Sequence, residues 1–186
     1  PYFPLGIIGI WRWSIWVAKK IVARKYKPIA ENGYSNTLSI VVPVYNEDPD
    51  IFQKALESWK NNNPDEIIAV IDYTDKSCIE VFRQFQQKNK KISKLIITKR
   101  PGKREALSDG IKAAKYNIIA LVDSDTVWEP NIKKIMLAPF KDSSVGGVGP
   151  RQDVLNINTL ARRLFNIHID HRYYDEMIYL ATVANG

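Results

Sequence analysis

Four short apolar runs, separated by segments with helical periodicity, constrain the fold of this chain more than any other feature of its sequence. The runs cover residues 38–44, 67–71, 94–98 and 118–122. Apolar runs of this length, rich in β-branched residues, are typical of strands that are buried on both faces of a parallel sheet. Because a helical segment separates each strand from the next, we predict an α/β fold with an open, mostly parallel sheet and right-handed crossovers.

The segments between and after these runs have the apolar spacing of helices that are buried on one side. The expected helices cover residues 50–61, 77–89, 105–116 and 157–180, and a further helix begins at Pro130. Asp50 is the expected N-cap of the first helix, whose apolar side includes Trp59. Ile111 is expected on the inward side of the third helix, and residues 145–149 predict a fifth strand at the sheet edge.

Distinctive polar residues follow three of the four predicted strands. They are Tyr45-Asn46-Glu47 after the first strand, Asp72 after the second, and Asp123-Ser124-Asp125 after the fourth. Ligands of open parallel sheets bind beyond the carboxyl ends of the strands. The convergence of three polar strand ends therefore predicts a ligand site at that edge.

The Asp123-Ser124-Asp125 segment carries the clearest chemical signal. In an extended segment, residues two apart point to the same side, so both carboxylates would face one divalent cation. Mg²⁺ typically binds one or two carboxylates and completes its shell with water and substrate phosphates. A cation held in this way neutralises a diphosphate leaving group. The alternative is an Asp-rich turn that caps the next segment.

The positive charge of the chain is concentrated near its N-terminus. The chain has 27 basic and 20 acidic residues, which gives a net charge of +7. Residues 1–34 contain six basic residues and one acid, Glu31, so the rest of the chain is nearly neutral. A nearly neutral main domain argues against a nucleic-acid-binding surface. We therefore divide the chain into a basic N-terminal helix at 1–34 and a main domain at 37–186.

The N-terminal segment combines an apolar start with tryptophan and positive charge. Its first eleven residues are uncharged, and Trp11, Trp13 and Trp16 lie where the basic residues begin. Eleven residues are too few for a bilayer-spanning helix, which needs about 20, but Trp is enriched at membrane interfaces and Lys and Arg flank membrane segments. Three interpretations stay open: the end of a truncated transmembrane helix, an interfacial helix with Trp13, Val17 and Ile21 on its apolar side, and a basic helix that packs on its own domain.

Several common kinds of site are excluded. Ile97 occupies the first glycine position of the Walker motif that Lys103 would complete. Gln152 occupies the last glycine position of a dinucleotide-binding motif. Cys78 is the single cysteine, so the chain has no internal disulfide and no cysteine-based zinc motif, and a reducing compartment fits best.

Several segments, in this order, resemble the family 2 glycosyltransferases. They are Val-Pro-Val-Tyr-Asn-Glu at 42–47, Val-Ile-Asp at 70–72, Gly-Lys-Arg-Glu-Ala-Leu at 102–107, and Leu-Val-Asp-Ser-Asp at 121–125. Within the family, the chain is most similar to the membrane-embedded processive synthases of the hyaluronan, cellulose and chitin synthase group. The resemblance covers residues 38–186. It implies a GT-A fold, a nucleotide-sugar donor, here a UDP-sugar, and a requirement for Mg²⁺ or Mn²⁺.

The resemblance also implies roles for individual residues on the nucleotide side of the site. Pro43, Tyr45 and Glu47 match the segment that lines the uridine pocket. Asp72 matches the acid that hydrogen-bonds the base, although Tyr-Thr-Asp follows it in place of the usual second acid and small residue. Lys103 matches a lysine near the nucleotide, and its ammonium group suits a diphosphate.

Asp123 and Asp125 match the catalytic DxD motif of the family. Both are expected to be catalytic and to bind the metal, with Asp125 as the firmer metal ligand, and Asp123 is also expected to contact the nucleotide-sugar. Arg151 and Gln152 match positions near the acceptor. The general base of the family is a carboxylate that lies downstream of the segment ending at Gly186, so we expect this segment alone to lack the base.

The implied function is metal-dependent, inverting transfer of a sugar from a nucleotide-sugar to a growing glycan by a membrane polysaccharide synthase. The N-terminal segment would contact the plasma or inner membrane, with the catalytic domain on the cytoplasmic side. Two alternatives stay open. A nucleotidyltransferase would need a glycine-rich basic loop near the first strand, and residues 42–47 form no such loop. A membrane-docked regulatory domain would bind nucleotide without turnover.

Overall fold

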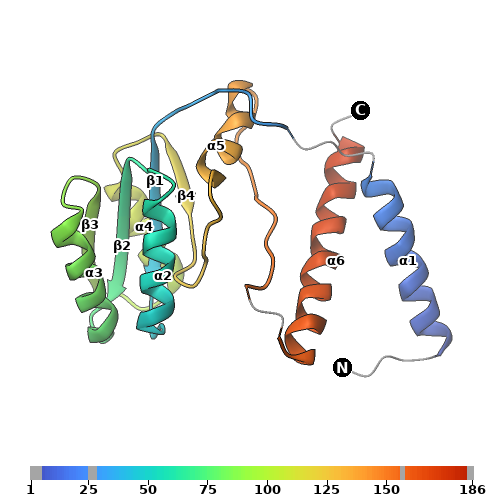
Figure 1. The fold of residues 1–186 in the computed structure, drawn as a ribbon, viewed down its shortest axis with the longest axis horizontal. Coiled ribbons are helices and arrows are strands. Elements are labelled where there is room, and N and C mark those ends of the chain that lie inside the picture. Colours follow the sequence, from blue (N-terminus) through green and yellow to red (C-terminus); the bar gives the residue numbers. More distant parts are fainter. Residues whose placement is uncertain (1–5, 25–28, 156–157, 184–186) are drawn as a thin grey trace. The chain divides into compact units, whose positions relative to one another are not determined.

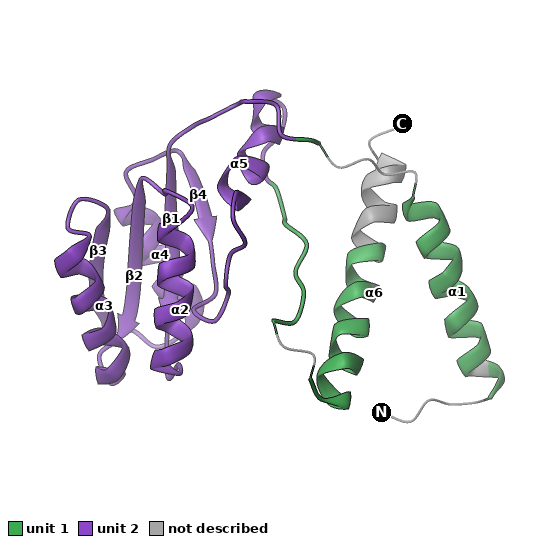
Figure 2. Ribbon diagram, in the orientation of Figure 1, with its two compact units in different colours: residues 1–30, 148–186 green, residues 31–147 purple. Residues whose placement is uncertain are grey.

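The computed structural model describes residues 6–24, 29–155 and 158–183. The chain forms two compact units, which are coloured separately in Figure 2. Residues 31–147 form the sheet unit, and residues 1–30 together with 148–186 form the helix unit. Parts of the predicted N-terminal helix and the first position of the predicted long helix lie outside the described residues.

The sheet unit is built on a four-stranded sheet with the order β3-β2-β1-β4 (Figure 1). The strands are β1 (Leu38–Val44), β2 (Glu66–Asp72), β3 (Ser93–Thr98) and β4 (Ile118–Leu121). Every pair of neighbours is parallel, and each strand boundary lies within one residue of its predicted position. This open parallel sheet with flanking helices confirms the predicted α/β fold of the GT-A type.

The helices of the sheet unit follow the predicted order. They are α2 (Pro49–Lys60), α3 (Lys76–Lys88), α4 (Lys103–Ala113) and α5 (Ile132–Leu137), and α5 continues into a 3₁₀ helix, η1 (Ala138–Lys141). Both faces of the sheet are covered. In β1, Ile40 and Val42 pack with α2 and α3, whereas Val41 packs against α4. This two-sided burial explains why the strands lack polar alternation.

One predicted N-cap, one predicted helix start and one predicted strand were wrong. The N-cap of α2 is Asp48, whose Oδ1 accepts hydrogen bonds from the first turn, because Pro49 fills the first helical position and leaves Asp50 inside the helix. Helix α5 begins at Ile132, two residues after Pro130, because Asn131 between them is left-handed with φ 69°. Residues 145–149 form no strand.

Helix α4 approaches the sheet closely at a glycine. A Cβ atom added to Gly110 would lie 2.3 Å from Cγ1 of Val41 and 3.2 Å from Cγ2 of Val70. Glycine is therefore the residue that allows this helix to rest on β1 and β2. The same geometry corrects the prediction for Ile111, which we expected to face the sheet but which is 41% exposed.

The described part of the helix unit contains two helices that pack on each other, α1 (Ile7–Ala23) and α6 (Leu160–Val183). The rings of Trp16 and Tyr174 meet edge to face with centroids 6.4 Å apart. Nζ of Lys20 lies 4.9 Å from the centroid of the Trp16 ring and 5.6 Å from that of Tyr174. Among the described residues, no helix combines the length and the apolar character that crossing a membrane requires.

Gly110→Ala is expected to lower the free energy of unfolding by about 1–3 kcal/mol, the usual cost of overpacking a core. Alanine favours a helix over glycine by up to about 1 kcal/mol, so a destabilised variant means that the steric conflict with Val41 dominates. Urea unfolding followed by tryptophan fluorescence measures this change. Gly146→Ala is the control, because its added Cβ meets nothing within 4 Å. A stabilised Gly110→Ala would contradict the close contact.

Candidate active site

The carboxyl ends of the parallel strands gather at one edge of the sheet, where the predicted site lies. Val44, the last residue of β1, is level with Ile71 of β2. Asp72 is the last residue of β2 and Tyr45 directly follows β1, so both lie at this edge. Tyr45 is 74% exposed, and Asp72 is half-buried. Pro43, one residue before Val44, is half-buried within β1.

Strand β4 ends before β1 does. Its last residue, Leu121, is level with Val41. The amide of Val122 still donates to the carbonyl of Val41 at 3.1 Å, and the chain then leaves the sheet. The residues that follow β4 therefore leave the sheet before β1 and β2 end, beside the last residues of β1.

The Asp123-Ser124-Asp125 segment forms a turn. The amide of Thr126 donates to the carbonyl of Asp123 at 3.1 Å, so the extended conformation that we assumed for this segment was wrong. Both Asp side chains are nonetheless exposed, and Ser124 between them is only 8% exposed. The turn thus presents two carboxylates to solvent and keeps the middle residue inside.

Helix α2 fixes the segment that follows this turn. The indole N–H of the fully buried Trp59 donates to the carbonyl of Thr126 at 2.8 Å. Oγ of Ser58 accepts from the amide of Trp128 at 3.0 Å. The side chain of Asn62, two residues after α2, donates to the carbonyl of Glu129 at 3.1 Å. Sequence reasoning placed Trp59 only on an apolar helix side. A buried indole N–H needs an acceptor, and this requirement was the available signal.

Asp72 carries a local hydrogen-bond network. Its Oδ1 accepts from Oγ1 of Thr74 at 2.5 Å and from the amide of Thr74 at 2.9 Å. These two bonds, the hydroxyl first, lower the pKa of Asp72 below its ordinary value, and the nearby charge of Lys76 adds to the effect. The Asp72 side chain is therefore an ionised acceptor at neutral pH.

Lys103 reaches the Asp-Ser-Asp turn from helix α4. It is the first residue of that helix and follows Gly102, whose φ of +105° favours glycine. Nζ of Lys103 lies 2.5 Å from Oδ1 of Asp123, and both side chains are 58% exposed. An ion pair this exposed adds little stability. Its significance is that a cationic group stands beside one of the two exposed carboxylates.

Glu47 and Asp75 are engaged in internal hydrogen bonds. Oε2 of Glu47 accepts from Oγ of Ser124 at 2.6 Å. Asp75, three residues after Asp72, is buried and caps α3 by accepting from the amide of Cys78 at 3.1 Å. Its other oxygen accepts from the amide of Glu47 at 3.3 Å. These contacts give both acids a structural role.

Arg151 and Gln152, the residues predicted near an acceptor, belong to the helix unit, and both are exposed. The Arg151 guanidinium donates to Asp153 at 3.1 Å and to Asp170 of α6 at 3.0 Å. It also lies 5.2 Å from the centroid of the Tyr173 ring. These contacts tie the segment before α6 to that helix. Burial alone would lower the pKa of Arg151, but the charges of Asp153 and Asp170 outweigh this effect and raise it. The acceptor role of both residues stays a prediction.

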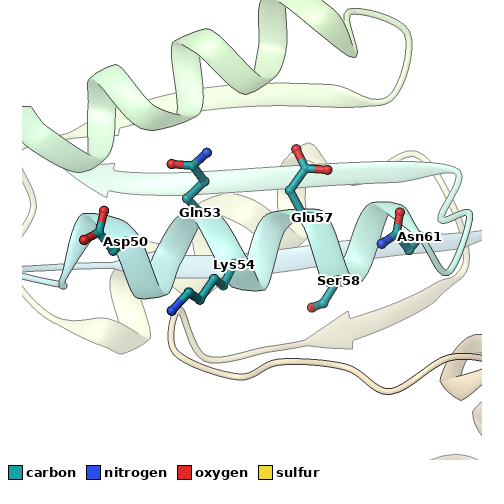
Figure 3. Close-up of a pocket in the computed structure, with 6 residues that line it drawn as sticks. All are labelled: Asp50, Gln53, Lys54, Glu57, Ser58 and Asn61. Carbon is teal, nitrogen blue, oxygen red and sulfur yellow. The ribbon is translucent and has the colours of Figure 1, made fainter.

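The sheet unit also has an open groove along the outer side of α2, shown in Figure 3. Its lining residues come from this helix and the residue that follows it, and are Asp50, Gln53, Lys54, Glu57, Ser58 and Asn61. None of them is a predicted site residue. The groove therefore shares no lining residue with the predicted site.

Comparison with known proteins identifies the family. The model of the glycosyl transferase family 2 matches residues 39–182, which is most of the chain. The chain belongs to glycosyl transferase family 2. Members of this family typically use a divalent cation.

The relatives come from fungi and bacteria. The chain is 32% identical over 154 residues to an NDP-glycosyltransferase, ltbB, of Aspergillus luteorubrus, covering 78% of this chain and 37% of the relative. It is 27% identical over 150 residues to a type 2 glycosyltransferase of Pyricularia oryzae, covering 76% of this chain and 30% of that protein. It is also 25% identical over 177 residues to the hyaluronan synthase of Streptococcus pyogenes, covering 91% of this chain and 42% of the synthase. The chain thus spans well under half the length of these curated relatives.

The residues of this family 2 chain fit a hard divalent cation. The exposed carboxylates of Asp123 and Asp125 offer the oxygen ligands that Mg²⁺ and Mn²⁺ prefer. Within the described parts of the chain, no group of three or more acidic, His or Cys side chains is placed to hold a metal. Two protein carboxylates match a site in which phosphate and water complete the shell, as is usual for Mg²⁺.

Thr74→Val is expected to raise the pKa of Asp72 toward its ordinary value, because the hydroxyl that binds the carboxylate is lost. Since the folded pKa is lowered, the stability that this carboxylate contributes is present at neutral pH and is lost as the pH falls through that value. NMR titration of the Asp72 carboxyl carbon measures the change. Thr74→Ser keeps the hydroxyl and should titrate like the wild type. Identical titrations of Thr74→Val and the wild type would contradict the assignment.

Proposed function

We propose that this chain is the donor-binding part of a membrane polysaccharide synthase, which transfers a sugar from a UDP-sugar to a growing glycan with inversion of configuration. The observation that carries the proposal is the gathering of three kinds of group at one edge of the sheet unit. They are an ionised acceptor at Asp72, a cation at Lys103, and two exposed carboxylates at Asp123 and Asp125.

In this proposal, the side chains at the sheet edge divide the nucleotide-sugar among them. Asp72 accepts a hydrogen bond from the uracil N–H, and the exposed ring of Tyr45 at the same edge packs on the nucleoside. The ammonium group of Lys103 binds the diphosphate as a compact positive charge. Asp123 and Asp125 would hold Mg²⁺ or Mn²⁺, which when bound supplies positive charge to the leaving diphosphate.

The attack on the anomeric carbon needs two further elements. An acceptor hydroxyl must approach from the face opposite the diphosphate, and a general base must take its proton. None of the described residues is assigned as this base. Arg151 and Gln152 are proposed to lie near the glycan acceptor, in keeping with their family positions.

The helix unit is proposed to contact the membrane through α1. Among the side chains of this helix whose exposure the structure describes, the large apolar ones that are exposed are Ile7, Ile10, Trp11, Trp13, Val17, Ile21 and Val22. Arg12, Lys19, Lys20 and Arg24 lie on the same helix or at its end. Apolar and cationic side chains on one helix are the combination that binds an anionic membrane surface. This contact would keep the sheet unit at the cytoplasmic face of the plasma or inner membrane.

Asp125→Asn is expected to weaken the binding of Mn²⁺ and UDP together by at least about tenfold, since even the loss of outer-shell partners costs a metal site 10–100-fold. Isothermal titration of the 186-residue chain with UDP, with and without Mn²⁺, measures this effect. Asp50→Asn, which changes another exposed carboxylate of the sheet unit, is the control and should bind like the wild type. Unchanged affinity of Asp125→Asn would refute the metal role. Tight binding by a longer chain that transfers no sugar would favour a regulatory domain.

The whole chain is expected to float with anionic phosphatidylglycerol vesicles, and the bound fraction should fall as salt is added. Ile10→Ser should weaken this binding about tenfold, because burying an isoleucine side chain is worth about 1.5–3 kcal/mol. Ile51→Ser, which alters an exposed isoleucine of the sheet unit, is the matched control. Failure to float at low salt would leave α1 as a helix that packs only on its own chain.

A further inference from the structure

We propose that Glu47 is a positioning residue, which holds the Asp123–Asp125 turn in place through the hydroxyl of Ser124. The resemblance to the family assigned Glu47 to the lining of the uridine pocket. The contacts of its carboxylate favour a different task. This inference rests on the proposed function of the turn as a metal and diphosphate site. It gives Glu47 and Ser124 the role of positioning the two metal-binding carboxylates, which the family resemblance does not imply.

The amide, the carbonyl and both carboxylate oxygens of Glu47 each make a hydrogen bond. Its amide donates to Oδ2 of Asp75 at 3.3 Å, and its carbonyl accepts from Sγ of Cys78 at 3.5 Å. Its Oε1 accepts from the amide of Asp48 at 3.0 Å, and its Oε2 accepts from Oγ of Ser124 at 2.6 Å. The first three contacts fix the residue at the start of α2 and α3, and the fourth reaches the turn after β4.

The thiol in this network, that of Cys78, is protonated at neutral pH. Cys78 is buried, and burial together with the charge of Asp75 raises its pKa to about 12. The thiol therefore stays protonated at neutral pH and keeps its S–H as a donor to the Glu47 carbonyl. Asp75 and Cys78 at the start of α3 thus hold the backbone of Glu47, and the amide of Asp48 and the hydroxyl of Ser124 hold its carboxylate.

The geometry of the turn explains why it needs this link. Asp123 and Asp125 are exposed, whereas Ser124 between them is turned inward. Oγ of Ser124 meets the carboxylate of Glu47, and a hydroxyl-to-carboxylate hydrogen bond is charge-assisted and stronger than a neutral one. Since Trp59 fixes the carbonyl of Thr126 on the other side, the turn is anchored at two points.

An anchored turn matters for binding a cation. Two carboxylates that repel each other must share one ion, and a free turn would separate them. Holding Ser124 in place fixes the backbone from which both carboxylates project. Less conformational entropy is therefore lost when the ion binds. Partners of this kind are worth about 10–100-fold in metal affinity when removed.

The test compares the binding of Mn²⁺ and UDP by variants of the 186-residue chain. Ser124→Ala is expected to weaken binding of UDP in the presence of Mn²⁺ by about tenfold, and to leave binding of UDP alone unchanged. Ser124→Thr keeps the hydroxyl and should recover most of the lost affinity. Glu47→Ala should act in the same way as Ser124→Ala, and the double variant should bind no more weakly than Glu47→Ala, because the two residues act as one unit.

Ser144→Ala is the matched control. Oγ of Ser144 donates to Oδ1 of Asp142 at 2.7 Å, so this change also removes a serine-to-carboxylate hydrogen bond within the sheet unit. It should leave Mn²⁺-dependent binding unchanged. The Mn²⁺ electron paramagnetic resonance spectrum provides a second readout, in which Ser124→Ala should show a larger signal of free Mn²⁺ than Ser144→Ala at equal concentrations.

The two proposals fail in different ways. If Asp125→Asn loses Mn²⁺-dependent binding while Ser124→Ala binds like the wild type, the positioning role is overturned and the proposed function stands. Additive losses in the double variant would equally overturn it, because Glu47 would then act on the ligand by itself. If Asp125→Asn binds like the wild type, both proposals are overturned.

Discussion

The candidate site depends on the different lengths over which β1 pairs with its two neighbours. Its pairing with β2 continues to Val44, but its pairing with β4 ends at Val41. The chain therefore leaves β4 three residues early and forms its turn beside the last residues of β1. The order β3-β2-β1-β4 also makes this the place where the chain reverses its direction across the sheet, and ligands of open α/β sheets bind at such a point.

Helix α4 connects the two sides of this site. It follows β3 at one edge of the sheet and leads to β4 at the other, so it crosses the face that β1 and β2 present. Its close contact at Gly110 sets how near it lies to Val41. Because Lys103 is the first residue of the same rigid helix, the packing of a glycine in the core also determines where that ammonium group stands.

The four strands could be predicted from the sequence because they are buried on both faces of the sheet, and continuous apolar runs indicate such burial directly. The errors arose where local hydrogen bonds compete. Pro49 moved the N-cap from Asp50 to Asp48, and Asn131 delayed the start of α5 beyond Pro130. Asp123 and Asp125 were predicted as site residues from their chemistry and by resemblance. The turn that carries them is closed by a backbone hydrogen bond from Thr126 to Asp123, which no sequence periodicity indicates.

The partners of Glu47 lie beyond the reach of sequence patterns for another reason. Ser124 is 77 residues away along the chain, and nothing in either segment records that they meet. The constraint is nonetheless strict. In this turn Asp123 and Asp125 are exposed, whereas Ser124 between them faces inward and meets the half-buried carboxylate of Glu47. An apolar side chain there would leave an oxygen of Glu47 without a partner, at a cost of about 1–3 kcal/mol. The middle position of this DxD motif is therefore restricted to side chains that donate a hydrogen bond.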